Sequence, residues 1–159
     1  GYTNSGKSTL LNRLCDEETF VEDKLFATLD TRSRALHLPS GRDVIVTDTV
    51  GFIRDLPKDL FAAFRATFDE TQDADLLLHV IDIHHPQYQK QVRSVERILE
   101  ELDLSHIPTL RVLNKQDRLK PDDLAKRVNI LKGVPIAAID SQTLHPLIDA
   151  MEKAATRDT

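Results

Sequence analysis

Apolar and polar positions recur along the chain with two different periods, and the period of two marks out the strands. Residues 34–48 alternate around a turn at Gly41, a pattern typical of a β-hairpin, and the second arm becomes apolar enough to predict full burial. Short apolar runs at 74–82, 108–114 and 134–139 predict three further buried strands. The sequence thus predicts five strands.

A period near 3.6 residues marks out helices between these strands. Residues 8–14 predict a helix that opens directly from a glycine-rich turn, and Pro121 followed by two aspartates is a typical helix start. Three more helices are expected where apolar residues share one face: Leu60, Phe61, Phe64 and Phe68; Tyr88, Val92, Val95, Leu99 and Leu102; and Leu144, Leu147, Ile148 and Met151.

Strands that alternate with helices indicate an α/β fold. We expect a mostly parallel sheet covered by helices on both faces, with one antiparallel strand supplied by the hairpin. The predicted strands fit such a sheet with its first, central strand missing. We expect that strand upstream of Gly1.

Composition narrows the class of protein. The chain has 159 residues, 40% hydrophobic and 30% charged, which is ordinary for one globular domain with a single core. Its single cysteine, Cys15, excludes an internal disulfide and is expected to be a small buried core residue. No apolar run approaches the roughly 20 residues that span a bilayer, and no signal peptide opens the chain. We therefore expect a cytoplasmic protein without a membrane span.

Charge gives little indication of a partner. The 21 basic and 26 acidic residues leave a net charge of −5, so the chain has no overall basic surface for nucleic acid.

His84 and His85 are adjacent, which makes their side chains diverge, and no third ligand follows at helical spacing. We expect a loop beside a bound nucleotide at this position rather than a metal site.

The glycine-rich turn carries the first chemical motif. Gly1, Gly6, Lys7 and Ser8 satisfy the pattern G-x-x-x-x-G-K-S. In this pattern backbone N–H groups close around phosphates, the lysine reaches the outer phosphates and the serine hydroxyl binds Mg²⁺. The residues expected to contact the nucleotide here are Gly1, Tyr2, Thr3, Asn4, Ser5, Gly6, Lys7, Ser8 and Thr9.

Two further motifs follow predicted strands, where ligands of open α/β sheets bind. "DTVG" places Asp48 where it can hold Mg²⁺ through water and lets Gly51 turn its N–H toward a terminal phosphate. "NKQD" ends with Asp117, whose carboxylate can accept two hydrogen bonds from guanine, a donor pair that adenine lacks. Taken alone, that tetrapeptide could equally be a turn that ends a strand. The expected nucleotide contacts are Asp48, Thr49, Val50 and Gly51, then Asn114, Lys115, Gln116 and Asp117.

Five segments together resemble the G domain of the HflX family of translation-factor-related GTPases. They are "GYTNSGKSTL", "LFATLDTRSR", "DTVGFIRDLP", "AAFRATFDET" and "LLLHVID", and the resemblance covers nearly the whole chain. It implies the three-layer sandwich of P-loop GTPases and a cytosolic GTPase that binds GTP, GDP and Mg²⁺. It also implies association with the large ribosomal subunit, in rescue or splitting of stalled or stressed ribosomes, without a stable homo-oligomer.

The same resemblance implies how the chain is organised. Residues 1–159 correspond to a G domain, and the family's N-terminal domain, helical linker and C-terminal extension are absent from the sequence. Thr28 matches the switch threonine, which completes Mg²⁺ coordination while a γ-phosphate is present. Its neighbours Phe26, Ala27, Leu29 and Asp30 are expected near the nucleotide. The implied Mg²⁺ ligands are Ser8, Thr28 and Asp48, and the implied catalytic residues are Lys7, Thr28, Gly51 and Asn4.

Two parts of the sequence depart from the common GTPase pattern. Phe52 stands where many GTPases place the glutamine that orients the attacking water, which predicts slow intrinsic hydrolysis. The last predicted strand ends in "IAAIDSQT", in which Ala137 replaces a serine and Ser141 and Thr143 stand at expected glycine positions. The backbone N–H of Ala138 could still reach the guanine carbonyl. Ala137, Ala138 and Ile139 are accordingly expected at the base.

Three classes of function remain open from these residues. The first is a GTP-hydrolysing switch that acts on ribosomes, and the second is a nucleotide-binding interaction module with little turnover. A P-loop kinase or ATPase is the third, disfavoured by "NKQD". Asn4 adds a further hypothesis, that a K⁺ ion beside the phosphates replaces the missing glutamine; the alternative is that Asn4 only shapes the turn.

Overall fold

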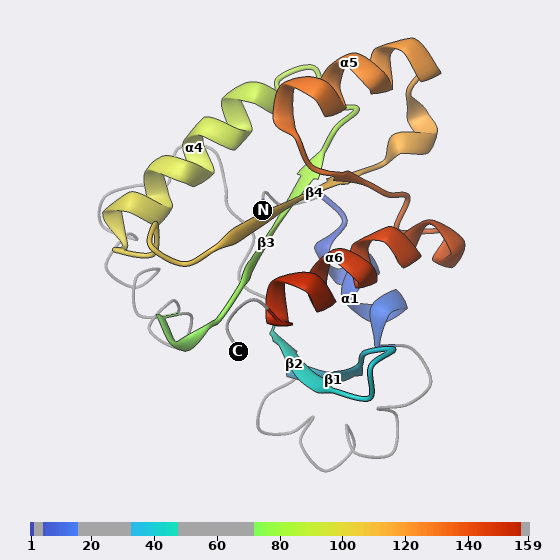
Figure 1. Cartoon of the computed structure of the whole chain (residues 1–159). Helices are drawn as coiled ribbons and strands as arrows, with labels where there is room; N and C mark the ends of the chain where they lie inside the picture. Colours follow the sequence, from blue (N-terminus) through green and yellow to red (C-terminus); the bar gives the residue numbers. More distant parts are fainter. Residues whose placement is uncertain (2–4, 16–32, 48–71, 157–159) are drawn as a thin grey trace.

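The computed structural model describes residues 1, 5–15, 33–47 and 72–156 of the chain (Figure 1). In these segments helices alternate with strands, as the hydrophobic pattern predicts. The elements in chain order are α1 (Lys7–Leu14), β1 (Ser33–His37), β2 (Asp43–Thr47), β3 (Leu77–Asp82), α4 (Tyr88–Glu101), β4 (Thr109–Asn114), the 3₁₀ turn η2 (Gln116–Arg118), α5 (Pro121–Leu131), β5 (Val134–Pro135), the 3₁₀ turn η3 (Ser141–Leu144) and α6 (His145–Thr156).

The strands form two sheets within the described segments. β3, β4 and β5 form a parallel sheet in that order, in which Asp82 at the end of β3 lies opposite Asn114 at the end of β4. β1 and β2 form an antiparallel hairpin, with Ser33 opposite Thr47. Because parallel strands end at the same edge, the loops after β3, β4 and β5 gather on one side of the sheet.

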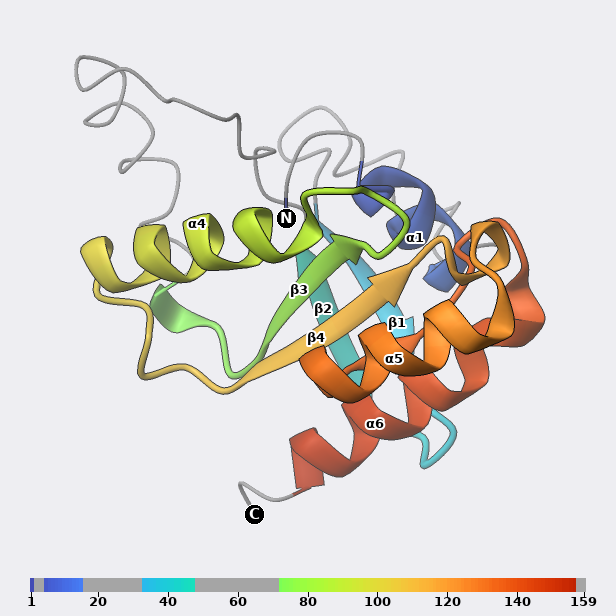
Figure 2. The ribbon, with the colours of Figure 1, turned by 90° about the horizontal axis from the view of Figure 1, so that it is seen from above.

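Helices cover both faces of the parallel sheet, as Figures 1 and 2 show. Leu78 and Val80 of β3 pack into the core on the side of α1 and α6. Ile81 of the same strand packs into the core on the side of α4 and α5, with Val92 and Leu131. This alternation follows from the period-two geometry of a strand. The predicted arrangement of helices on both faces of a mostly parallel sheet is confirmed.

The second arm of the hairpin is less buried than the sequence predicts. In β2, Val44 and Val46 pack against the core, whereas Asp43, Ile45 and Thr47 are exposed, and Ile45 retains 71% of its surface. Within the described residues the core covers the hairpin on one face, and alternate side chains of a strand point to opposite faces. The prediction of full burial was therefore wrong for this part of the chain.

The last strand is also shorter than predicted. It comprises Val134 and Pro135 rather than the whole of residues 134–139. The Ile136 N–H still donates to the Leu113 carbonyl at 2.8 Å, but the next backbone N–H groups turn to side chains instead of to β4. The apolar run continues because these residues are buried in a loop, which periodicity alone does not distinguish from a strand.

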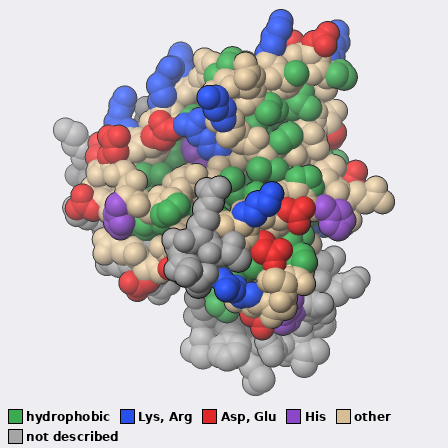
Figure 3. Space-filling view, in the orientation of Figure 1, with side chains coloured by type: hydrophobic (Ala, Val, Ile, Leu, Met, Phe, Trp, Pro, Cys, Tyr) green, Lys and Arg blue, Asp and Glu red, His purple; other side chains and the backbone are tan. Residues whose placement is uncertain are grey.

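Several other sequence predictions are confirmed. Pro121 is the first residue of α5, Cys15 is 4% exposed, and α1 opens directly after the glycine-rich turn. The helix expected around Phe61, Phe64 and Phe68 lies outside the described residues. No helix in the described segments is long and apolar enough to cross a membrane. Basic and acidic side chains are interspersed over α4 and α5 on the face of the molecule that Figure 3 shows.

Candidate nucleotide-binding site

A pocket of about 340 Å³ opens where the amino terminus of α1 meets the loops that follow β4 and β5. Its volume is within the range of small-molecule sites, and its position is the edge at which open parallel sheets bind ligands. Its lining residues are Gly6, Thr9, Asn114, Lys115, Asp117, Arg118, Ala138 and Ile139. Every one of them except Arg118 was a predicted nucleotide contact.

Gly6 lies where the glycine-rich turn becomes helix α1. Its φ angle is +97°, and a Cβ atom at this position would lie 2.1 Å from Nδ2 of Asn114. Both the left-handed backbone and the close approach require glycine. Lys7, Ser8 and Thr9 follow in the first turn of α1, and the amino terminus of a helix favours an anion. Gly6 and Thr9 line the pocket, so the amino terminus of α1 lies at one end of it.

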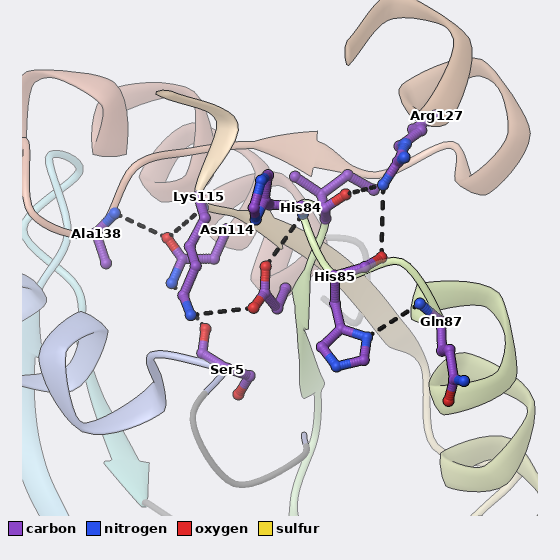
Figure 4. Close-up of polar contacts among 10 residues, drawn as sticks. Ser5, His84, His85, Gln87, Asn114, Lys115, Arg127 and Ala138 are labelled. Atoms are coloured by element: carbon purple, nitrogen blue, oxygen red, sulfur yellow. Dashed lines mark hydrogen bonds and ion pairs between the residues drawn. The ribbon is translucent and has the colours of Figure 1, made fainter. Parts of the chain in front are cut away.

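Asn114 connects three backbone segments around the pocket (Figure 4). Its Nδ2 donates to the Ser5 carbonyl at 2.8 Å, and its Oδ1 accepts N–H groups of Lys115 at 2.8 Å and Ala138 at 2.9 Å. Asn114 is 3% exposed, and its bonds to Ser5 and Ala138 are buried and so shielded from water. Asn114 thus joins the phosphate turn to the loops after β4 and β5.

Lys115 is held across the sheet edge by a carboxylate that sequence reasoning did not single out. Its backbone is left-handed, with φ at +69°, and its Nζ lies 3.0 Å from Oδ2 of Asp82. Asp82 also accepts the backbone N–H of His84 at 3.1 Å. The Lys115 side chain is 22% exposed and the Asp82 side chain is 15% exposed. The only sequence signal for Asp82 was its place as the carboxylate that ends an apolar run.

Asp117 lies in η2 and lines the pocket beside Arg118. The Asp117 side chain is exposed, and among the described residues no donor binds its carboxylate. The loop after β5 also lines the pocket, and there Ala138 is 3% exposed whereas Ile139 retains 65% of its surface. The pocket therefore combines an exposed carboxylate from η2 with backbone of the loop after β5.

The paired histidines form part of the loop between β3 and α4. The Gln87 N–H donates to Nδ1 of His85 at 3.0 Å, and Arg127 donates to the Ile83 carbonyl at 2.7 Å (Figure 4). No group of three metal-ligating side chains occurs in the segments that the structure describes. The expected loop is present, and in these segments neither histidine belongs to a metal-ligating cluster.

Many of the predicted site residues cannot be compared with the structure. Tyr2, Thr3 and Asn4, the switch segment with Phe26 to Asp30, and Asp48 to Gly51 all lie outside the described residues. Their roles, including that of Thr28, stay predictions. Gly1 is described and lies against β3, where an added Cβ atom would be 2.2 Å from the Val80 carbonyl oxygen.

Comparison with known proteins places this arrangement among GTPases. The profile of the 50S ribosome-binding GTPase family matches residues 1–115. The GTPase HflX of Magnetococcus marinus is 45% identical over 159 residues, which cover 99% of this chain and 37% of the relative. The GTPase HflX of Escherichia coli is 48% identical over 129 residues, covering 81% of this chain and 30% of the relative.

Solved structures agree with the sequence relatives. A GTP-binding protein of Sulfolobus solfataricus in complex with GDP superposes with a TM-score of 0.82 at 29% identity, covering 100% of this chain and 51% of that one. Era of Aquifex aeolicus, bound to GDP and AlF4⁻, gives a TM-score of 0.67 at 21% identity, a likeness of fold alone.

The fold is that of a P-loop GTPase. The chain belongs to the 50S ribosome-binding GTPase family, and its resemblance to the HflX G domain is confirmed by the relatives described above. It spans about a third of the length of these curated relatives, 37% and 30% respectively.

Proposed function

We propose that this chain is the G domain of a GTP-hydrolysing switch that acts on the large ribosomal subunit in the rescue or splitting of stalled ribosomes. The proposal rests on one observation. The phosphate turn, Asn114 and Asp117 all meet at the same pocket. Family membership supports the same conclusion, because the matching family is described by its binding to the 50S subunit.

The base would bind between the loops after β4 and β5. Asp117 supplies an exposed carboxylate for the ring N–H and the exocyclic amine of guanine, and adenine offers no such pair. Lys115 lines the same pocket, and its pairing with Asp82 keeps its aliphatic stem beside the space where the base would lie. These features favour GTP and GDP over ATP, and so disfavour a kinase or ATPase.

The phosphates would bind at the amino terminus of α1. Lys7 would neutralise the outer phosphates, and the exposed hydroxyl of Ser8 in the first helical turn suits a hard cation such as Mg²⁺. Thr28 and Asp48 would complete the Mg²⁺ site, and Gly51 would donate its N–H to the γ-phosphate. When bound, Mg²⁺ would neutralise charge that develops on the phosphate oxygens during hydrolysis.

Single-turnover hydrolysis with the full-length protein separates the possible functions. We expect GTP to be hydrolysed slowly alone and at least tenfold faster with 50S subunits, whereas ATP is not hydrolysed. Lys7→Ala should remove hydrolysis, and Lys126→Ala, on the exposed surface of α5, should leave it unchanged. Tight GTP binding without turnover, even with subunits, would support an interaction module, and equal use of ATP would support a kinase or ATPase.

Phe52 raises the question of what replaces the usual glutamine. We propose that Asn4 helps bind a K⁺ ion, whose charge would stabilise the transition state between the β- and γ-phosphates. Replacing Na⁺ with K⁺ at constant ionic strength should then raise the hydrolysis rate about tenfold or more, close to 1.4 kcal/mol of barrier. Asn4→Ala should abolish this difference, and equal rates of the unaltered protein in both salts would assign the stimulation to the ribosome alone.

A further inference from the structure

The loop that follows β5 lacks the side chains that would ordinarily hold it in place. This base-edge loop, residues 136–140, carries alanine at positions 137 and 138, so its backbone must be fixed by groups from elsewhere. Both alanines are 3% exposed, which makes unpaired backbone groups costly at this site. The hydrogen bonds around the loop identify what holds it.

Thr143, in the 3₁₀ turn η3, supplies a hydroxyl to both ends of the base-edge loop. Its Oγ1 accepts the Ala137 N–H at 2.9 Å and lies 2.8 Å from the Ala137 carbonyl oxygen and 2.7 Å from that of Asp140. The single hydroxyl proton can therefore be donated to either carbonyl. Two backbone bonds close the same turn, from the Asp140 N–H to Ala137 and from the Thr143 N–H to Asp140.

One peptide unit links this hydroxyl to the nucleotide pocket. The Ala137 carbonyl and the Ala138 N–H belong to the same planar trans peptide, so they point in opposite directions. On one side, the carbonyl faces the Thr143 hydroxyl; on the other, the N–H donates to Oδ1 of Asn114 at 2.9 Å. Fixing the carbonyl at Thr143 therefore fixes the direction of the Ala138 N–H at the pocket wall.

We propose that Thr143 is a positioning residue for guanine recognition, which it achieves by orienting the Ala137–Ala138 peptide. The inference rests on the proposed guanine-nucleotide site. The Ala138 N–H would be presented to the 6-oxo group of guanine, which would share it with Asn114. The Thr143 hydroxyl thus takes the place of the serine that the loop lacks at position 137. Thr143 lies six positions further along the chain.

Three nucleotides test the proposal because they differ at single positions of the base. GDP and inosine diphosphate both carry the 6-oxo acceptor, whereas 6-thio-GDP keeps the two donors for Asp117 and replaces this oxygen with sulfur, a weaker acceptor. In full-length protein, Thr143→Val removes the hydroxyl and preserves the branched shape. We expect Thr143→Val to weaken the binding of GDP and inosine diphosphate by roughly tenfold, which corresponds to the loss of one hydrogen bond. The binding of 6-thio-GDP should weaken by less than about twofold.

Two further variants serve as controls for this titration. Thr143→Ser retains the hydroxyl and should restore GDP affinity to within about threefold of the unaltered protein. Ser141→Ala removes an exposed hydroxyl from the same 3₁₀ turn and should leave all three affinities unchanged.

The outcomes distinguish a positioning role from a structural one. An equal loss for all three nucleotides in Thr143→Val would mean that the hydroxyl only stabilises the loop, and unchanged affinities would mean that the backbone bonds suffice; either result overturns the proposal. If the unaltered protein bound none of the three diphosphates, the guanine site itself would be wrong.

Discussion

The side-chain amide of Asn114 donates to the backbone carbonyl of Ser5 at 2.8 Å, although the two residues lie 109 positions apart in the sequence. Ser5 belongs to the phosphate turn and Asn114 to the loop expected to bind the base, so one buried hydrogen bond fixes the distance between the two halves of the pocket. This rigidity is what a site needs in order to bind both ends of a nucleotide at once.

Asn114→Ala should therefore weaken both the fold and nucleotide binding. The change leaves the Ser5 carbonyl and the N–H groups of Lys115 and Ala138 without their side-chain partner, and buried unpaired groups cost about 1–3 kcal/mol each. Because water will reach some of them, we expect a loss of about 2–4 kcal/mol in the free energy of unfolding, measured by urea denaturation. The matched control is Asn129→Ala, an exposed position of α5, and an equally small change in both variants would contradict the central role of Asn114.

Asp82→Asn should release Lys115 from its place beside the base. The carboxamide has nearly the same shape as the carboxylate but removes the negative charge that faces the largely buried Lys115 ammonium group. We expect GDP affinity to fall about fivefold to tenfold and the free energy of unfolding to fall by about 1–2 kcal/mol. Asp149→Asn, at an exposed position of α6, should alter neither.

A double-mutant cycle between Asp82→Asn and Lys115→Met isolates this pair. If the ion pair acts as the structure indicates, the coupling energy should reach about 1 kcal/mol. Additive effects of the two substitutions on GDP affinity would show that Asp82 does not act through Lys115.

His79 makes the stability of the chain sensitive to acid. Burial, reinforced by the positive charge of Arg111, lowers the pKa of His79 to about 3 from its usual 6.5. The unfolded chain therefore binds a proton below pH 6.5 that the folded chain does not bind until about pH 3, and stability falls as the pH falls through this window. Between pH 7.5 and pH 5 the loss should be about 2 kcal/mol.

Denaturation at several pH values tests this assignment. His79→Gln should flatten the dependence of the free energy of unfolding between pH 7.5 and pH 5, whatever its effect at neutral pH. His106→Gln, at an exposed position, should leave the slope unchanged. If His79→Gln retained the full slope, other groups would have to account for the acid sensitivity.

The hydrophobic pattern predicted the order of elements better than it predicted their edges. Pro121 marked the start of α5 correctly because the ring of proline suits the first helical turn, whatever packs around it. The hairpin arm with Ile45 was misjudged because burial depends on what covers the second face of a strand. The helix expected between β2 and β3, around Phe61, Phe64 and Phe68, stays a prediction.

The candidate site likewise contains residues that the sequence predicts and residues that it does not. Gly6, Asn114 and Asp117 were predictable because their spacing encodes the chemistry of phosphate and guanine binding. Asp82 and Thr143 were not, because each acts through contact with a residue distant in the sequence or through the path of a loop. Sequence motifs identify the groups that bind a ligand, whereas the groups that hold them in position become visible only in three dimensions.

The guanine site is tested most directly by exchanging the base preference at Asp117. Asp117→Asn replaces an acceptor of two hydrogen bonds with a group that can accept one and donate one, which matches xanthine instead of guanine. In equilibrium titrations of the full-length protein we expect GDP affinity to fall by roughly 2–3 orders of magnitude and xanthosine diphosphate affinity to rise, with ADP bound weakly by both forms. Unchanged GDP affinity in Asp117→Asn would contradict the assignment of this pocket to guanine nucleotides.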